Sequence, residues 1–345
     1  FITQHLTGSD FLKLSEVSHS WNQFVSGSEE AMKKIQLVVI ENWSREVDLE
    51  VFEKSTRKYK HLKVENLLRT RENVVKLIHQ FADSLETIES FFDFDLNGLQ
   101  LLSLKFLSIH TRHVSSHVPN GLSYAATNLT RLHLSGPNPF PLSIINCFKM
   151  NPKLEELQLD SDVSEIFFNL MTPEIAEGCL LKKLSLNSVK FSDTALRGLA
   201  ILLGSQIDTI TELKILQCEL SFLIKVFGGM KSLRRLTYSP AHYLAQYRCP
   251  TLKPHPTLEE LNLIHPNVNL VKGLVAASPK LKSLYIANAN WEIFENVAIR
   301  APNLLQFRYA FFTDIDFSVD DIRDGYKNKM QKFSNVKKGL EIIQV

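Results

Sequence analysis

The sequence predicts an α/β solenoid, in which short strands alternate with helices and successive repeats stack on one another. Three observations support this fold class. An apolar motif recurs along most of the chain, prolines stand at one place before several copies of it, and the pattern between copies changes to the period of a helix. The chain also has 51 leucines in 345 residues, an excess that is typical of repeat proteins.

The recurring motif is an apolar residue, two variable residues, an apolar residue, one variable residue and a third apolar residue. Its clearest copies are Leu129/Leu132/Leu134, Leu154/Leu157/Leu159, Leu181/Leu184/Leu186 and Leu258/Leu261/Leu263. Looser copies are Met32/Ile35/Leu37, Tyr59/Leu62/Val64, Leu85/Ile88/Ser90, Leu104/Leu107/Ile109, Ile210/Leu213/Ile215, Leu233/Leu236/Tyr238, Leu281/Leu284/Ile286, Leu304/Phe307/Tyr309 and Leu340/Ile343/Val345. The copies recur about every 26 residues, and the alternation at the end of each one predicts a short strand.

Four prolines share one position relative to this motif. Pro152, Pro256, Pro279 and Pro302 each stand two residues before the first leucine of a copy. A proline ends the preceding helix and favours an extended chain, so this placement marks the step from a helix to the next strand. The shared position therefore supports a true repeat against a chance recurrence of leucine.

Helical patterns occupy the segments between copies of the motif. Residues 193–203 have apolar side chains at helical spacing, with Asp193 as the expected N-cap and Gly204 as the expected end. The same spacing predicts helices over residues 74–81, 271–277 and 291–299. A single strand and helix cannot bury their apolar faces alone, so each repeat must stack on its neighbours.

Over residues 30–345 the chain resembles the leucine-rich-repeat family. The resemblance implies a curved solenoid with a parallel sheet on the concave side and helices on the convex side. We expect a single solenoid domain at residues 29–345 with about 13 repeats. Residues 310–339 are rich in charge and interrupt the rhythm. A longer or additional helix is expected there, either as a solvated insertion or as a feature that binds a partner.

The first 25 residues follow a different pattern. We expect one helix to end at Gly8 and a second helix, capped by Ser9 or Asp10, to begin there. The apolar residues at helical spacing in this segment are Leu14, Val17, Trp21 and Phe24. So short a segment cannot bury this apolar set by itself. The resulting helical hairpin either caps the first repeat or docks on another protein.

The segment from Leu6 to Val25 resembles the second half of an F-box, and we assign residues 1–28 to a partial F-box domain. The matching positions are Leu6, Phe11, Leu12, Leu14, Val17, Ser18 and Trp21. The leucine-proline segment that opens this family's domain is absent. Because the chain starts with Phe1 instead of Met, we expect the N-terminus to be truncated.

An F-box followed by leucine-rich repeats is the arrangement of substrate receptors in SCF-type cullin–RING ubiquitin ligases. The resemblance implies that the matching positions bind the SCF adaptor subunit, and through it the cullin, while the repeats bind a target protein. A separate ubiquitin-conjugating enzyme performs the reaction. The alternative is a leucine-rich-repeat scaffold or inhibitor that binds a partner protein without any link to ubiquitin.

The residues between the apolar positions of each strand are expected to face the concave side. Those we select as target contacts are Glu156, Gln158, Lys183, Arg235, Tyr285 and Arg308. Tyrosine and arginine are favoured at the energetic centres of interfaces. The charges on this face are mixed and the net charge is +2, so neither nucleic acid nor a membrane is indicated as a partner. A solvated face that binds nothing is the alternative for each of these residues.

Motifs for metal binding or catalysis are weak. His110, His113 and His117 form a cluster, but no cysteine or carboxylate stands nearby to complete a metal site. Residues 314–325 begin like a calcium loop but have Val319 where that loop requires glycine. We therefore expect no metal, no cofactor and no enzymatic activity.

The cysteine content favours an intracellular protein, in the cytoplasm or the nucleus. The four cysteines are Cys147, Cys179, Cys218 and Cys249, and no Cys-x-x-Cys motif occurs. So few cysteines in a chain of this length are typical of reduced, buried side chains and not of a disulfide framework. No apolar run approaches the length of about 18 residues that a membrane span needs.

Overall fold

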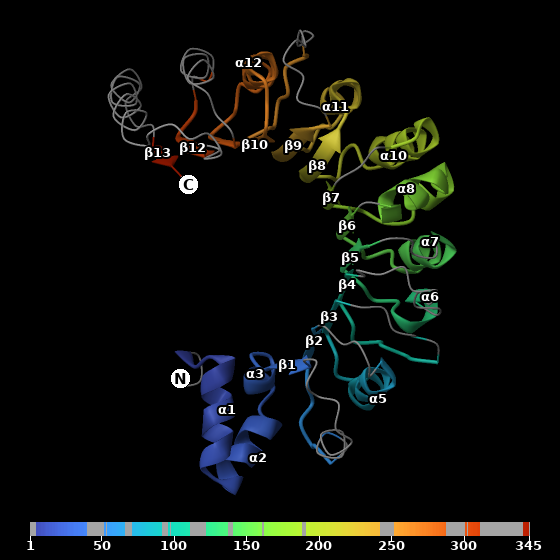
Figure 1. Ribbon diagram of the computed structural model, residues 1–345, viewed down its shortest axis with the longest axis vertical. Coiled ribbons are helices and arrows are strands. Elements are labelled where there is room, and N and C mark those ends of the chain that lie inside the picture. Colours follow the sequence, from blue (N-terminus) through green and yellow to red (C-terminus); the bar gives the residue numbers. More distant parts are fainter. Residues whose placement is uncertain are drawn as a thin grey trace, which may run out of the picture. The chain divides into compact units, whose positions relative to one another are not determined.

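Figure 1 shows a computed structural model of the chain, which describes residues 5–39, 52, 54–65, 71–91, 96, 98–110, 122–136, 141–160, 162–187, 191–241, 252–287, 301, 303–310 and 341–344. The chain forms two compact units, unit 1 at Phe1–Leu180 and unit 2 at Leu181–Val345.

Unit 1 begins with a helical hairpin and continues with strands and helices in alternation. The hairpin consists of α1 (Gly8–Val17) and α2 (His19–Gly27), followed by the short helix α3 (Glu29–Met32). The strands are β1 (Gln36–Val39), β2 (His61–Val64), β3 (Thr87–Ser90), β4 (Phe106–His110), β5 (Arg131–Ser135) and β6 (Glu156–Asp160). The other helices are α5 (Arg71–Phe81), α6 (Leu122–Ala125), α7 (Pro141–Met150), α8 (Asp162–Asn169) and α9 (Pro173–Ala176). Each strand pairs in parallel with the next one.

The described part of unit 2 repeats the same alternation of strands and helices. Its strands are β7 (Lys183–Asn187), β8 (Glu212–Cys218), β9 (Arg235–Pro240), β10 (Glu260–Ile264), β11 (Ser283–Ala287), β12 (Gln306–Ala310) and β13 (Glu341–Gln344). Its described helices are α10 (Asp193–Ser205), α11 (Leu220–Phe227) and α12 (Val268–Ala276). Here too each strand is parallel to the next.

This architecture is the predicted leucine-rich-repeat solenoid. In each unit the strands follow one another in chain order, and the helices that connect them lie on one side of the strands (Figure 1). The domain boundary at residue 28 and the count of about 13 repeats stay predictions. Among the described helices, none has the length and apolar character needed to cross a membrane.

The apolar motif forms the core between the strands and the helices. In β5 and β6, Leu132 lies opposite Leu157 and Leu134 lies opposite Leu159, and all four side chains are buried. The residues between them face the other side of the sheet and are more exposed. Burial of one leucine side chain contributes about 1.5–3 kcal/mol, so the aligned leucines stabilise the stacking of neighbouring repeats.

A repeated backbone contact sets the register of the strands. The N–H groups of Glu86 and Thr87 both donate to the carbonyl of Lys60, at 2.8 and 3.0 Å. One repeat later, those of Lys105 and Phe106 donate to the carbonyl of Glu86, at 2.9 and 3.1 Å. The same contact begins β5 and β6 in unit 1, and β8 to β12 in unit 2. Because it recurs at the same place in these repeats, it brings the apolar motifs of successive strands side by side.

The predicted register is wrong at the first copy of the motif. Leu37 in β1 takes the position opposite Leu62 that the pattern assigns to Ile35. Met32 ends α3 instead of starting the motif, and Ile35 is buried just before the strand. The error is two residues and therefore keeps the same side chains on the same face, so the sequence pattern could not detect it.

The predicted register is also wrong at the last copy. Ile342 in β13 lies opposite Phe307, where the pattern assigns Ile343. Ile343 instead lies opposite Arg308, on the other face of the sheet. Because two isoleucines stand next to each other, alternation alone cannot select the one that lies opposite Phe307. Leu340 and Val345, the other members of this copy, lie outside the described residues.

The helix predicted from Asp193 is α10, but its N-cap is Ser192, whose hydroxyl accepts a hydrogen bond from the N–H of Ala195 at 3.2 Å. The helix continues past Gly204 by one residue. Two other predicted helices match the structure: residues 74–81 lie in α5, and residues 271–277 overlap α12. The helices predicted over residues 291–299 and 310–339 lie outside the described residues.

The hairpin helices begin at other caps than those predicted. Thr7 caps α1, where its hydroxyl accepts from the N–H of Asp10 at 3.3 Å and its own N–H donates to the Asp10 carboxylate at 2.8 Å. Ser18 ends α1 and caps α2, accepting from the N–H of Trp21 at 3.2 Å. Val17 and Trp21 therefore lie on two helices and not on one continuous helix.

Gly8→Ala should destabilise unit 1. A Cβ at Gly8 would lie 2.1 Å from the carbonyl oxygen of Lys34, so α1 would have to move away. We expect the free energy of unfolding to fall by about 1–3 kcal/mol, measured by thermal denaturation followed by circular dichroism. Gly27→Ala in α2 is the control, because nothing lies within 4 Å of its added Cβ. Equal losses in the two variants would contradict this close approach.

Asn151→Ala should destabilise the same unit for a different reason. The Asn151 side chain is 1% exposed, accepts from the N–H of Leu129 at 2.7 Å, and donates to the carbonyls of Ala126 and Cys147 at 2.9 and 2.7 Å. Its loss leaves buried groups unpaired, so we expect a decrease of about 2–4 kcal/mol in urea denaturation. Asn128→Ala, which removes one exposed hydrogen bond, should cost less than about 1 kcal/mol.

Candidate functional site

Large apolar side chains are exposed on the N-terminal hairpin. Leu12 is 37% exposed, Val17 71%, Trp21 43% and Phe24 47%. The rings of Trp21 and Phe24 meet edge to face, with their centroids 5.7 Å apart. We call these four residues the hairpin patch. Exposed apolar clusters of this kind mark surfaces that bind other molecules.

Contacts on the other residues of the hairpin hold it against the start of the repeats. Phe11 and Val25 are fully buried. The guanidinium group of Arg57 reaches both helices, because its Nη2 donates to Ser15 Oγ and to Asn22 Oδ1, each at 2.8 Å. The hairpin is therefore attached by one set of residues while the hairpin patch is left accessible.

The F-box resemblance selects seven residues, and the structure leaves six of their side chains accessible in full or in part, all except that of Phe11. Leu12, Val17 and Trp21 belong to the hairpin patch, and Leu6 and Leu14 are half-buried. These residues form a contiguous stretch of the chain but lie on two helices and the turn before them. Contact with an adaptor stays a prediction for all of them.

The other two selected residues have structural roles. Phe11 has no exposed surface, and the ammonium group of Lys34 lies over its ring, 5.9 Å from the centroid, so Phe11 packs the hairpin and is not part of its surface. Ser18 is exposed, but its hydroxyl is engaged as the cap of α2. The resemblance did not select Phe24. Its spacing of three residues from Trp21 in a helix is the signal that places it in the same patch.

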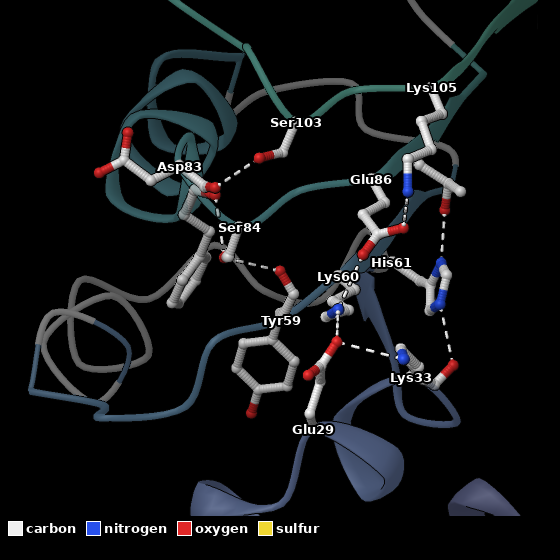
Figure 2. A network of polar contacts seen from close by, with 12 residues as sticks. Glu29, Lys33, Tyr59, Lys60, His61, Asp83, Ser84, Glu86, Ser103 and Lys105 are labelled. Atoms are coloured by element: carbon white, nitrogen blue, oxygen red, sulfur yellow. Dashed lines mark hydrogen bonds and ion pairs between the residues drawn. The ribbon is translucent and has the colours of Figure 1, made fainter. Parts of the chain in front are cut away.

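A chain of ion pairs joins α3 to the starts of three strands (Figure 2). Lys60 Nζ lies 3.0 Å from Glu29 Oε1 and 2.8 Å from Glu86 Oε1. The other oxygen of Glu86 lies 2.8 Å from Lys105 Nζ. Lys60, Glu86 and Lys105 stand directly before β2, β3 and β4, at the backbone contact that sets the register. The network therefore ties the base of the hairpin to the first repeats of unit 1.

The strands of unit 1 carry a polar face that includes two of the predicted target contacts. Glu156 Oε1 lies 2.9 Å from His133 Nε2, and Gln158 lies opposite His133 in register. The guanidinium of Arg131 lies over the Phe106 ring, 4.3 Å from its centroid. Glu156 and Gln158 are half-buried among these neighbours, and target contact by either residue stays a prediction.

In unit 2 the first residue of each strand faces away from the core, and from β7 to β10 these residues alternate in charge, as Lys183, Glu212, Arg235 and Glu260. Glu212 lies between two cations, with Lys183 Nζ at 3.3 Å and an Nη of Arg235 at 2.9 Å. Arg235 Nε also lies 3.3 Å from Glu260. We call this series the first row. The predicted target contacts Lys183 and Arg235 are therefore already paired within the protein.

The other two predicted contacts lie one position further along their strands. Tyr285 on β11 and Arg308 on β12 are opposite each other in register, and both are half-buried. Nη2 of Arg308 lies 3.6 Å from Glu260, a longer separation than those of the first row. The structure brings these two residues together, and their contact with a target stays a prediction.

The described part of the histidine cluster is His110, at the end of β4. Its ring nitrogens lie 2.9 Å from Ser108 Oγ and 2.6 Å from Ser135 Oγ, and burial lowers its pKa. His113 and His117 lie outside the described residues. Among the described residues, no group of three or more histidine, cysteine or carboxylate side chains is placed to hold a metal ion. The calcium-like segment 314–325 is not described.

The three described cysteines are buried and free of disulfides. They are Cys147, Cys179 and Cys218, and burial raises the pKa of each thiol to about 12. A thiol with so high a pKa stays protonated and is a poor nucleophile or metal ligand. Cys249 lies outside the described residues.

Comparisons with known proteins add one finding. No protein-family model matches the chain, and no curated protein matches it. Among solved structures, the chain is similar to the crystal structure of a TLR13–ssRNA13 complex, with 14% sequence identity and a TM-score of 0.39 over 80% of this chain and 48% of that one. The chain thus spans about half the length of that structure. Its assignment to the leucine-rich-repeat fold rests on its own strand register and buried motif.

Glu86→Gln should make the stability of unit 1 less sensitive to acid. Hydrogen bonds from Lys105 and Lys60 lower the pKa of Glu86 from 4.5 to about 2 in the folded chain. The contribution of this carboxylate is therefore complete above pH 4.5 and is lost as the pH falls toward 2. We expect the wild-type chain to exceed the variant by at most about 3 kcal/mol at neutral pH, with the difference shrinking below pH 4.5.

Urea denaturation across this pH range measures that difference. Glu89→Gln on β3 is the matched control, since Glu89 lies outside the Lys60–Glu86–Lys105 network and interacts with the charge of Lys63 opposite it without a salt bridge among the described residues. Its difference from the wild type should not vary with pH in the same way. A constant difference for Glu86→Gln would show that the ion-pair network does not stabilise the fold.

Proposed function

We propose that this chain is a non-catalytic substrate-recognition subunit of an SCF-type cullin–RING ubiquitin ligase. In this proposal the hairpin binds the SCF adaptor and the strand face of the repeats binds a target protein inside the cell. The chain performs no reaction of its own, and a separate ubiquitin-conjugating enzyme transfers ubiquitin to the bound target.

The observation that carries the proposal is the hairpin patch. It lies on the segment whose residues resemble an F-box, and three of its four members are positions that this resemblance selects, namely Leu12, Val17 and Trp21. Burial of apolar surface against a partner is favourable in proportion to its area. A protein partner that covers this patch would therefore gain most from the two aromatic rings and the adjacent aliphatic side chains.

The way the hairpin is attached also supports a docking role. Arg57 joins α1 to α2, and Lys34 Nζ donates to the carbonyl of Leu6 at 3.1 Å. Glu29 connects the following helix to the repeats through Lys60. A surface that is held in place before binding loses less conformational entropy when a partner arrives. The hairpin is thus suited to present the patch without rearrangement.

On the strands, polar residues alternate with buried apolar residues and form a polar face. This face supports a target-binding surface separate from the hairpin. These side chains come from the repeats and not from the hairpin, so a target and an adaptor would contact different residues of the chain. Their mixed charge and hydrogen-bonding groups suit a folded or extended protein segment. A substrate receptor requires one surface that binds the adaptor and a second surface that binds the target.

The proposal predicts that purified SCF adaptor binds the full chain and that a Val17→Ala, Trp21→Ala double variant loses this binding. Aromatic anchors at interfaces contribute about 2–4 kcal/mol, so we expect the affinity to fall at least about 100-fold in a pull-down followed by titration. Both residues are exposed, and the variant should keep the circular dichroism spectrum of the wild type.

Tyr124→Ala provides the matched control, because it removes an aromatic side chain that is 77% exposed on α6, outside the hairpin. It should bind the adaptor like the wild type. An absence of adaptor binding by the wild-type chain, or unchanged binding by the folded double variant, would overturn the proposal. A scaffold or inhibitor with no link to ubiquitin would then explain the two surfaces better.

A further inference from the structure

The strands of unit 2 carry a second row of facing residues beside the first row. We call it the middle row, and its members lie opposite one another in register from β7 to β12. They are Ser185, Lys214, Thr237, Asn262, Tyr285 and Arg308. The middle row therefore contains two cations and no carboxylate, whereas the first row alternates in charge.

Lys214 is a half-buried cation in this row. Within the part of the chain that the structure describes, it forms no ion pair. Its acidic neighbour on the same strand is Glu212, whose two oxygens are engaged by Lys183 and Arg235. The positive charge of Lys214 is therefore left for an external anion.

Hydroxyl groups flank Lys214 on both adjacent strands. Ser185 on β7 lies opposite Lys214, and its Oγ is buried without a hydrogen-bond partner among the described residues. Thr237 lies opposite Lys214 on β9, where its Oγ1 accepts from Asn262 Nδ2 at 3.3 Å and so keeps its own hydrogen to donate. An ammonium group between two hydroxyl donors is suited to hold a carboxylate.

Arg308 is the second cation of the middle row, and its pairing is incomplete. It shares Glu260 with Arg235 and with Asn262, whose atoms lie closer to that carboxylate, at 3.3 and 3.2 Å, than the 3.6 Å of Arg308. Nε of Arg308 has no hydrogen-bond partner among the described residues. The guanidinium group therefore has donors available for another acceptor.

We propose that the middle row of unit 2 binds an extended acidic peptide segment of the target protein. One carboxylate of the segment pairs with Lys214, a second pairs with Arg308, and Tyr285 contacts the peptide between them. The two cations are four strands apart, about 19 Å at the usual strand spacing, which an extended peptide spans in about six residues. The positive charge of the row and the neutralised first row beside it favour an acidic partner.

This inference rests on the proposed function only in taking the strand face as the target-binding surface. The adaptor experiment concerns the hairpin patch in unit 1, and the peptide experiment concerns residues of unit 2. Either one can fail while the other succeeds, so the two failures are distinguishable.

The test is selection of random displayed peptides on the immobilised full chain, compared with a Lys214→Gln, Arg308→Gln double variant. The wild type should enrich peptides that have two acidic residues five to seven positions apart. A selected peptide, labelled with fluorescein, should bind the double variant at least about tenfold more weakly in fluorescence anisotropy. Lys214→Arg keeps the cation and should retain most of the affinity, which separates loss of charge from loss of fold.

Lys183→Gln is the matched control, because its charge is already balanced by Glu212 in the first row. It should select the same peptides as the wild type. No enrichment of acidic residues, or enrichment that persists in the double variant, would overturn the proposal. A short fluorescent oligothymidine that binds the wild type more tightly than any selected peptide, and loses binding in the double variant, would assign the row to nucleic acid and overturn it as well.

Discussion

At the start of β3 to β6 and of β8 to β12, two adjacent N–H groups donate to one carbonyl of the preceding repeat, and the arrangement of side chains within each unit depends on this contact. It places successive strands in one register, as Lys60, Glu86 and Lys105 illustrate in unit 1. A shift of one residue would move every apolar side chain to the solvent face. The backbone contact and the buried leucines therefore stabilise the same register. Only in that register are the hydrogen bonds formed and the leucine side chains buried.

The same register orders the polar side chains into rows. Residues that face away from the core lie directly opposite their counterparts in the next repeat, so charges at one repeat position become neighbours in space. In unit 2 this produces a first row of alternating charge and a middle row in which Lys214 forms no ion pair with a described residue and Arg308 shares Glu260 with Arg235. Specific binding can thus arise from a few positions where the charge pattern of an otherwise regular set of repeats changes.

The hairpin differs from the repeats, because some of its apolar residues are buried against the protein and others are exposed. Phe11 and Val25 are buried and attach it, while Val17 and Trp21 are exposed and available to a partner. The sequence pattern grouped Val17 and Trp21 with Leu14 and Phe24 and left out Phe11 and Val25, since helical spacing shows that a side chain is apolar and on a given face but not what covers it. Ser18, which separates α1 from α2, divides the set in a way that spacing alone does not reveal.

The sequence by itself determined the repeat, the parallel strands that its family resemblance implies, and the buried positions of most internal copies. Where a leucine stands between polar neighbours, as Leu157 does between Glu156 and Gln158, alternation leaves one choice of face. Only the tertiary structure decided the register at the two ends, where Ile35 and Leu37, or Ile342 and Ile343, are equally apolar. It also decided which cations are paired, because ion pairs such as Arg235–Glu212 join residues about one repeat apart and depend on side-chain geometry that no local pattern encodes.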